Sequence, residues 1–418
     1  MRFRSARSRD SLRRTVADVT AGLRRAVPPG KPGVERVTVD RALGRVLADS
    51  LRARRTVPPN DRSMMDGYAV RAAGARRRES GPPFTRTVIG RSVPGLDPRR
   101  LPRVNSRTAI EILTGGPMPP GANAVLRLES TERRGRSIRA RSRVVPGRDI
   151  ARRGEDFQRG KPLFAAGTSL RPWHLATLAA HDIRLVRVYR RPVVGLLRTG
   201  GEFPPDRHPP RPRHVRDTTR PLLRAALSEL GVQYADLGSV PDRLADTRRA
   251  IARALTRCDV VLTVGGSSVG ARDLVPSAVG RLSGARRIAS GVWLRPGSST
   301  GVAVVRGRPV FLLPGPPVAA FAGFLALVEP FLDRWTDPRH RSRPSVRARL
   351  AFGRPHDRRF EELVRVRLRT RRSGTWARAV AGRGSSHLSS LSRSDGLAVL
   401  ARGRGAYRRG DPVTVWLL

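Results

Sequence analysis

The chain of 418 residues has one cysteine, two lysines and seven histidines, and each shortage excludes a class of protein. Cys258 alone cannot form an intramolecular disulfide, and one thiol cannot build a metal site from clustered cysteines. The histidines do not have the spacing of metal ligands. So few thiols fit a reducing compartment, and we expect a cytoplasmic protein.

Long apolar runs are also missing. No stretch reaches the roughly 18 apolar residues of a transmembrane helix, so we expect no membrane partner. The basic segment from Met1 to Arg14 lacks the apolar core of a signal peptide. Apolar residues still make up 39% of the chain, which is enough for globular folding. The length predicts about two to four domains.

Acidic residues are scarce, with 33 against 83 basic residues and a formal net charge of +50. Such a charge suggests a polyanionic partner. The basic residues, however, are spread along the whole chain, and all except Lys31 and Lys161 are arginines. A GC-rich coding background produces the same bias. We therefore expect only non-specific nucleic-acid binding, and polyanion binding stays a separate hypothesis based on charge alone.

Five motifs rich in glycine or proline follow one another in the sequence. In the first, Ser-Met-Met-Asp-Gly-Tyr-Ala-Val, Asp66 precedes Gly67, which places a carboxylate on a tight turn where the backbone can approach a ligand. An ordinary turn acid is the alternative. The other motifs lie at 112–116 (Ile-Leu-Thr-Gly-Gly), 153–156 (Arg-Gly-Glu-Asp), 264–270 (Val-Gly-Gly-Ser-Ser-Val-Gly) and 313–317 (Leu-Pro-Gly-Pro-Pro).

The periodicity predicts an α/β multidomain protein. We expect an N-terminal composite region over 1–187, with a β-rich domain inserted at about 75–148. Within this region, Asp40 is expected to cap a helix carrying Leu43, Val46 and Leu47. Residues 188–336 alternate strands and helices, which is typical of a doubly wound parallel sheet with helices on both faces. A basic linker then leads to a small all-β C-terminal domain over 345–418.

The turn from Val264 to Gly270 follows a predicted buried strand. Open α/β sheets bind ligands at such turns, and its amides and hydroxyls can hold an anion. The glycine spacing is neither that of a dinucleotide fold nor that of a P-loop, and a plain strand-to-helix turn is the alternative.

Acids and prolines flank the same predicted sheet edge. Asp242 and Asp273 can hold Mg²⁺, partly through water, although Asp242 also fits a helix N-cap. Glu202 is either a ligand contact or a solvated loop acid. The motif from Pro314 to Pro317 can shape a pocket wall or simply start a helix.

Taken together, the ordered motifs resemble those of the molybdopterin molybdenumtransferase family, the molybdenum insertases related to the gephyrin E domain. The matches cover 63–69, 114–115, 152–156, 265–270, 313–317 and 384–391. The resemblance implies a transferase of molybdenum cofactor biosynthesis. Such an enzyme inserts molybdate into adenylated molybdopterin with Mg²⁺ and releases AMP. It also implies a homodimer and contacts with other cofactor-synthesis proteins or molybdoenzymes.

The resemblance further assigns roles to residues. Asp66, Asp242 and Asp273 are expected to be catalytic, and Asp242, Asp273 and Glu202 to bind metal or place molybdate. Asp66, Thr114 and Asp156 are expected to line the partner's side of a site shared between subunits. The remaining substrate-binding residues implied are Glu202, Gly265, Gly266, Ser268, Gly270, Arg295, Pro314 and Pro317.

Several positions depart from the family pattern near the expected pocket. Gly201 stands where the family usually has Asp, Thr219 where it has Asn, Ser298 where it has Lys and Pro316 where it has Asn. These changes support an alternative hypothesis, a non-catalytic molybdopterin-binding or cofactor-delivery paralogue.

Overall fold

The computed structural model describes residues 13–27, 33–72, 84–200, 216–266, 274–336, 343–372, 374–382 and 384–418. They belong to two compact units. The N-terminal unit comprises Arg36–Leu43 and Leu47–Val188, and the main unit comprises Met1–Glu35, Gly44–Val46 and Tyr189–Leu418. In these described ranges, no helix has both the length and the apolar character needed to span a membrane.

The N-terminal unit is rich in short strands. One sheet has the order β8-β5-β7-β6-β10-β9 around a core that includes Tyr68 and Leu126. A second core, around Leu178 of helix α3, includes Leu47. The bounds are β5 Gly67–Val70, β6 Thr85–Ser92, β7 Thr108–Ile112, β8 Ala124–Arg127, β9 Thr131–Arg134, β10 Ser137–Ala140 and α3 Pro172–Ala180, with the short strands β3 Leu51–Arg52, β4 Arg62–Ser63, β11 Ile150–Ala151 and β12 Pro162–Phe164.

The prediction of a helix that begins after Asp40 is wrong. A single 3-10 turn, η1 Val39–Arg41, forms instead. Gly44 follows with a φ of +69°, which a helix does not permit. Leu47 is then extended and bridges to Val188. Leu47 is buried in this extended segment, so its apolar side chain fits the pattern that predicts a helix face without a helix being present.

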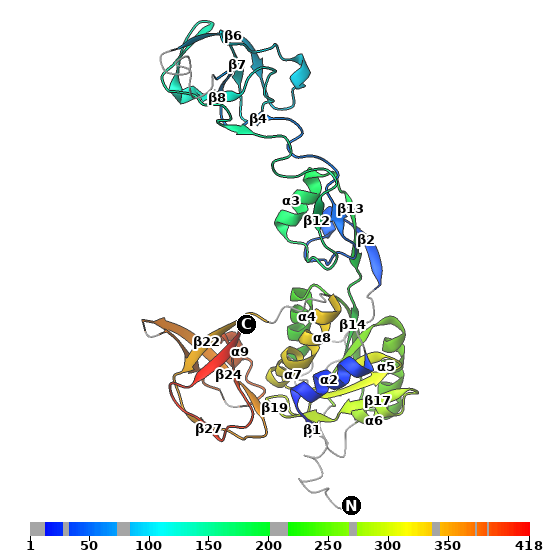
Figure 1. The fold of residues 1–418 in the computed structure, drawn as a ribbon. Coiled ribbons are helices and arrows are strands. Elements are labelled where there is room, and N and C mark those ends of the chain that lie inside the picture. Colours follow the sequence, from blue (N-terminus) through cyan, green and yellow to red (C-terminus); the bar gives the residue numbers. More distant parts are fainter. Residues whose placement is uncertain are drawn as a thin grey trace, which may run out of the picture. The chain divides into compact units, whose positions relative to one another are not determined.

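The main unit contains a sheet with helices on both faces (Figure 1). Helices α2, α4 and α7 share one core with it, and α5 and α6 share the other. The strands run in the order β15-β14-β16-β21-β20-β17. The bounds are α2 Val16–Ala26, β14 Val193–Thr199, α4 Thr219–Glu229, β15 Gln233–Val240, α5 Leu244–Arg257, β16 Val260–Val264, α6 Leu274–Gly280, β17 Ala285–Ala289, β20 Gly301–Val305, β21 Arg308–Leu313, α7 Pro317–Gly323, a π-helical turn Phe324–Val328 and α8 Glu329–Thr336.

The sheet is parallel only in part. Strands β15, β14, β16 and β21 are parallel as predicted. Strand β20 runs antiparallel to β21, and β17 runs antiparallel to β20, so only β20 is reversed relative to the four parallel strands. The cause is a tight hairpin between β20 and β21. Arg306 and Gly307 both have positive φ there, which is the backbone of a two-residue hairpin turn.

The C-terminal residues form a closed barrel. Strands β24, β25, β22, β28 and β26 pair in a ring, and β26 returns to β24. Strand β19 of the α/β domain adds to β24, and Leu363 and Leu397 of the barrel join the core of the α/β domain. The barrel and the α/β domain therefore share both a sheet and a core. The bounds are β19 Leu294–Arg295, β22 Ser345–Leu350, β24 Glu361–Arg371, β25 Gly374–Ala379, β26 Gly396–Leu400 and β28 Pro412–Leu417.

Candidate active site

The connections of the α/β sheet change direction between β14 and β16. The chain passes from β14 through α4 to β15 on one side, and then through α5 to β16 on the other side. Where the loops after two neighbouring parallel strands lead to opposite sides of the sheet, a ligand crevice usually forms between them. Thr199 and Gly265 lie at the carboxyl ends of these two strands.

Gly265 and Gly266 are required by close packing in this crevice. A Cβ on Gly265 would lie 2.5 Å from the carbonyl oxygen of Thr199, and one on Gly266 would lie 2.7 Å from Val275 Cγ2. Their φ angles are +88° and +58°. Only glycine combines this backbone with this space, so the loop exposes bare main chain to the crevice.

The expected acids are only partly described. Asp242 follows β15, whose Val240 carbonyl accepts a hydrogen bond from the Gly200 amide at 3.4 Å. Asp242 therefore lies at the carboxyl edge of the same sheet. The predicted residues Glu202, Ser268, Gly270 and Asp273 lie outside the described residues. Among the residues that are described, no three His, Cys, Asp or Glu side chains gather as a metal site would require.

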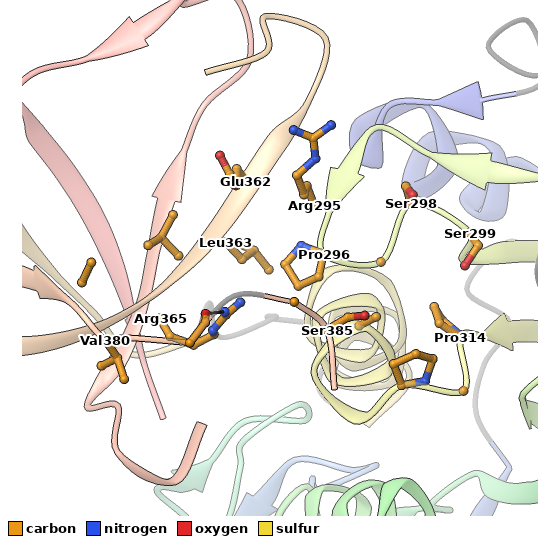
Figure 2. A pocket seen from close by; sticks show the side chains of 18 of the residues that line it. Arg295, Pro296, Ser298, Ser299, Pro314, Glu362, Leu363, Arg365, Val380 and Ser385 are labelled. Carbon is orange, nitrogen blue, oxygen red and sulfur yellow. Dashed lines mark hydrogen bonds between the residues drawn. The ribbon is translucent and has the colours of Figure 1, made fainter. Parts of the chain in front are cut away.

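A cavity of about 1310 Å³ lies between the α/β domain and the barrel. Gly265, Gly266, Arg295 and Pro314, four of the predicted site residues, line it. Pro317 does not line it, because this residue begins α7 and is buried. Figure 2 shows Ser298, Ser299 and Pro314 on the α/β side and Leu363, Arg365 and Val380 on the barrel side.

The barrel wall carries a guanidinium group that is only partly satisfied. Arg365 donates from Nη2 to the Gly382 carbonyl at 2.9 Å, while its buried Nε has no hydrogen-bond partner among the described residues. Burial, together with the nearby Arg354, lowers the pKa of Arg365. Arg354 is itself paired with Glu362 at 3.0 Å. Arg365 is thus a cation of the barrel wall whose N–H donors are not all used within the described residues.

Sequence reasoning missed Arg365 and Ser385 as individual site residues. Arg365 stands between Val364 and Val366 in β24, so a polar residue on the outward face of the strand was the available signal. Ser385 lies in the 384–391 pattern and lines the cavity, and its carbonyl accepts the Val318 amide at 3.0 Å.

In the N-terminal unit, the structure joins the first two motifs. Asp66 Oδ1 accepts hydrogen bonds from the Thr114 amide at 2.7 Å and from Thr114 Oγ1 at 2.8 Å. These bonds lower the pKa of Asp66 and fix its carboxylate. The Ser63 amide and carbonyl pair with Gly116 and Gly115 in the same loop.

The third motif docks on the first through Asp61, which sequence reasoning also missed. Asp61 accepts from the Arg152 side chain at 2.7 Å and from the Arg153 amide at 2.8 Å. Asp156 is held elsewhere in the loop, because its amide donates to the Val57 carbonyl at 3.1 Å. Asp66 and Thr114 are therefore brought together directly, and Asp156 is linked to them only through the loop.

The fold and the cavity define a class: a multidomain protein whose doubly wound domain and barrel bring glycine backbone and arginines to one cavity. Family models agree along the chain. Residues 12–181 match the MoeA N-terminal region (domain I and II), 195–334 a probable molybdopterin binding domain, and 347–418 the MoeA C-terminal region (domain IV). The chain belongs to the molybdopterin molybdenumtransferase, or MoeA, family.

Individual proteins show the same likeness. The molybdopterin molybdenumtransferase of Bacillus subtilis is 31% identical, over 97% of this chain and 95% of its own length. That of Haemophilus influenzae is 29% identical, over 91% and 93%. The crystal structure of the molybdopterin biosynthesis moeA protein of Pyrococcus horikoshii has a TM-score of 0.79 and 28% identity, and covers 97% of this chain and 100% of that one.

Proposed function

We propose that this protein is a molybdopterin molybdotransferase. It inserts molybdate into adenylated molybdopterin and releases AMP, in molybdenum cofactor biosynthesis. The observation that carries the proposal is the cavity at the glycine loop, since it joins the ligand crevice of an α/β domain to a second, cationic wall. The relatives described above bear the name molybdopterin molybdenumtransferase, which supports this proposal.

Molybdate is a tetrahedral dianion, and the cavity offers the donors that it needs. Arg295 and Arg365 provide guanidinium groups, and Ser298, Ser299 and Ser385 provide hydroxyls. Guanidinium forks bind oxyanions in pairs of hydrogen bonds. We therefore place molybdate between Arg365 and the 295–299 loop, in preference to the carboxylates, which repel a dianion.

The adenylated substrate fits the other end of the crevice. The Gly265 amide already donates to the Leu313 carbonyl at 3.1 Å, so we assign the pterin or its phosphate to the part of the glycine loop that follows Gly265. Asp242, Asp273 and Glu202 offer only oxygen ligands, which is the donor set of Mg²⁺. When bound, this ion supplies Lewis-acid assistance to cleavage of the phosphoanhydride. Asp242 lies at the appropriate sheet edge for this role.

We further propose a cytoplasmic homodimer in which the N-terminal unit of one protomer completes the site of the other. Asp66 suits such a role because Thr114 keeps it ionised and fixed. Asp156 and Thr114 would line the same side. Other cofactor-synthesis proteins or molybdoenzymes would receive the product.

A second candidate function is a non-catalytic paralogue that binds or delivers the cofactor. Ser298 and Pro316 line the cavity where the resemblance leads us to expect a lysine and an asparagine, which removes one cation and one amide. Turnover separates the two functions. The purified protein is mixed with adenylated molybdopterin, molybdate and Mg²⁺, and AMP and metal insertion are followed. Coupled AMP release establishes the transferase, whereas tight adenylate binding without AMP establishes the paralogue.

A further inference from the structure

The outer surface of the barrel carries a regular array of arginines. Successive residues of a strand point to opposite faces of the sheet. Ala348, Val366 and Ala377 lie in the core of the barrel, so the residues next to them in β22, β24 and β25 face outward. These outward residues, which we call the arginine face, are Arg347 and Arg349 of β22, Arg367, Arg369 and Arg371 of β24, and Trp376 and Arg378 of β25.

Strand pairing places Trp376 at the centre of this face. Arg369 of β24 lies opposite Trp376 on one side, and Arg349 of β22 lies opposite it on the other side. Arg378, the next outward residue of β25, lies opposite Arg367. Residues opposite one another on neighbouring strands have their Cβ atoms about 4.5–5.5 Å apart. The half-buried indole is therefore flanked by arginines on both sides.

The arginines of this face have no carboxylate partners. All six are exposed, and in the described ranges no ion pair joins any of them to an acid. Arg349 donates to the Gly410 carbonyl at 3.2 Å, and Arg367 donates to the Arg393 carbonyl at 2.8 Å. Both acceptors are neutral, so the six positive charges remain uncompensated.

The acids of the barrel are engaged elsewhere. Residues 345–418 include 17 arginines and five acidic residues. Three of these acids form ion pairs outside the arginine face, with Arg354, Arg359 and Arg404. Of the other two, Asp395 accepts the Leu368 amide at 2.8 Å, and burial raises the pKa of Glu361. The shortage of acids and their placement together leave this face uniformly positive.

A positive surface with an aromatic ring at its centre has the chemistry that single-stranded nucleic acid requires. Guanidinium groups bind the phosphates, and a base stacks on the ring. Alternate residues of a strand are about 6.6 Å apart, so Arg367, Arg369 and Arg371 offer a straight row of cations to an extended nucleic-acid backbone. An acidic protein would use these arginines but not the ring of Trp376.

We propose that the arginine face binds single-stranded RNA, with phosphates on the arginines and a base on Trp376. RNA is the abundant single-stranded nucleic acid of the cytoplasm, the location proposed above. The inference does not depend on the transferase activity. It gives a surface and a ligand to the polyanion hypothesis, which was based on charge alone.

The test compares two triple variants of the full chain. The face variant leaves the cavity residue Arg365 in place and combines Arg369→Gln, Arg371→Gln and Arg378→Gln. The control variant removes three exposed arginines of α5 and combines Arg248→Gln, Arg253→Gln and Arg257→Gln. Both variants lose three positive charges. Binding of a fluorescein-labelled single-stranded RNA of mixed sequence is measured by fluorescence anisotropy over a range of salt concentrations.

The face variant should lose phosphate contacts that the control variant keeps. At about 0.7 per lost contact, the slope of log K against log salt concentration should become shallower by about 2. At about 0.15 M salt this corresponds to binding that is about 10- to 50-fold weaker. The control variant should stay within about threefold of the wild-type protein. Equal weakening of the two variants would mean that binding is spread over the whole chain, and it would overturn the inference.

A second pair of variants tests the ring. Trp376→Leu should weaken binding of the single strand about tenfold, whereas Trp376→Phe should retain most of the affinity because a base can still stack on the ring. Duplex RNA with the same number of phosphates hides its base faces, and polyglutamate has none. Both should bind more weakly than the single strand and should not respond to Trp376→Leu. Duplex RNA or polyglutamate that binds as tightly as the single strand would assign the face to charge alone and overturn the inference.

Discussion

Substituting Gly265 by alanine tests the crevice at the centre of the site. Alanine at a φ of +88° costs about 1–2 kcal/mol. Its Cβ would also lie 2.5 Å from the backbone oxygen of Thr199, which cannot rotate away. Overpacking of this kind costs about another 1–3 kcal/mol. We therefore expect Gly265→Ala to lower the free energy of unfolding by about 2–5 kcal/mol in total and to abolish AMP release.

A matched glycine separates the two costs. Gly307 has a φ of +79°, and a Cβ there would meet nothing within 4 Å. Gly307→Ala should cost only the backbone part, about 1–2 kcal/mol. Urea unfolding followed by tryptophan fluorescence gives both values. If Gly265→Ala and Gly307→Ala lose equal stability and both retain turnover, the activity does not depend on the close approach of the β14 and β16 loops.

Three further predictions concern single side chains. Arg365→Gln should weaken molybdate binding about 10- to 100-fold in calorimetry, since a charged hydrogen-bond donor is lost, and unchanged affinity would remove Arg365 from the site. Thr114→Val should move the pKa of Asp66 up toward its ordinary 3.8, because one of the two hydrogen bonds to the carboxylate disappears. The acid limb of the pH–rate profile should then shift to higher pH. An unchanged acid limb would exclude Asp66 as the group that causes it. Burial lowers the pKa of His181, so the stability that depends on its neutral form is present above pH 6.5 and is lost as pH falls. His181→Gln should therefore reduce the fall of the melting temperature with decreasing pH. An identical fall in the variant would assign the pH dependence to another group.

Local patterns predicted much of the fold. The buried strand predicted before the glycine-rich turn is confirmed as β16, because its apolar run is local. Helices such as α4 likewise confirm the predicted alternation of strands and helices. The antiparallel direction of β20 was not predicted, since it depends on the hairpin at Arg306 and Gly307. Helix α2 was missed, although Thr15 and Asp18 have the spacing of a capping box.

The site was predictable where a motif lies in one loop and not where it depends on two domains. The structure places Gly265, which belongs to the glycine-rich motif, and Arg295, which the resemblance implied, in one cavity. Arg365 was out of reach because nothing local shows that its strand closes this cavity from the barrel. Asp61 was overlooked because its partners Arg152 and Arg153 are about ninety residues away in the sequence.

Locating molybdate in a crystal tests the account most directly. Crystals of the full chain are soaked with molybdate, and anomalous scattering at the molybdenum edge gives the position of the metal. The account predicts a peak between Arg365, Ser385 and the 295–299 loop, and its loss in Arg365→Gln. A peak beside Asp242 with the cavity empty would contradict it.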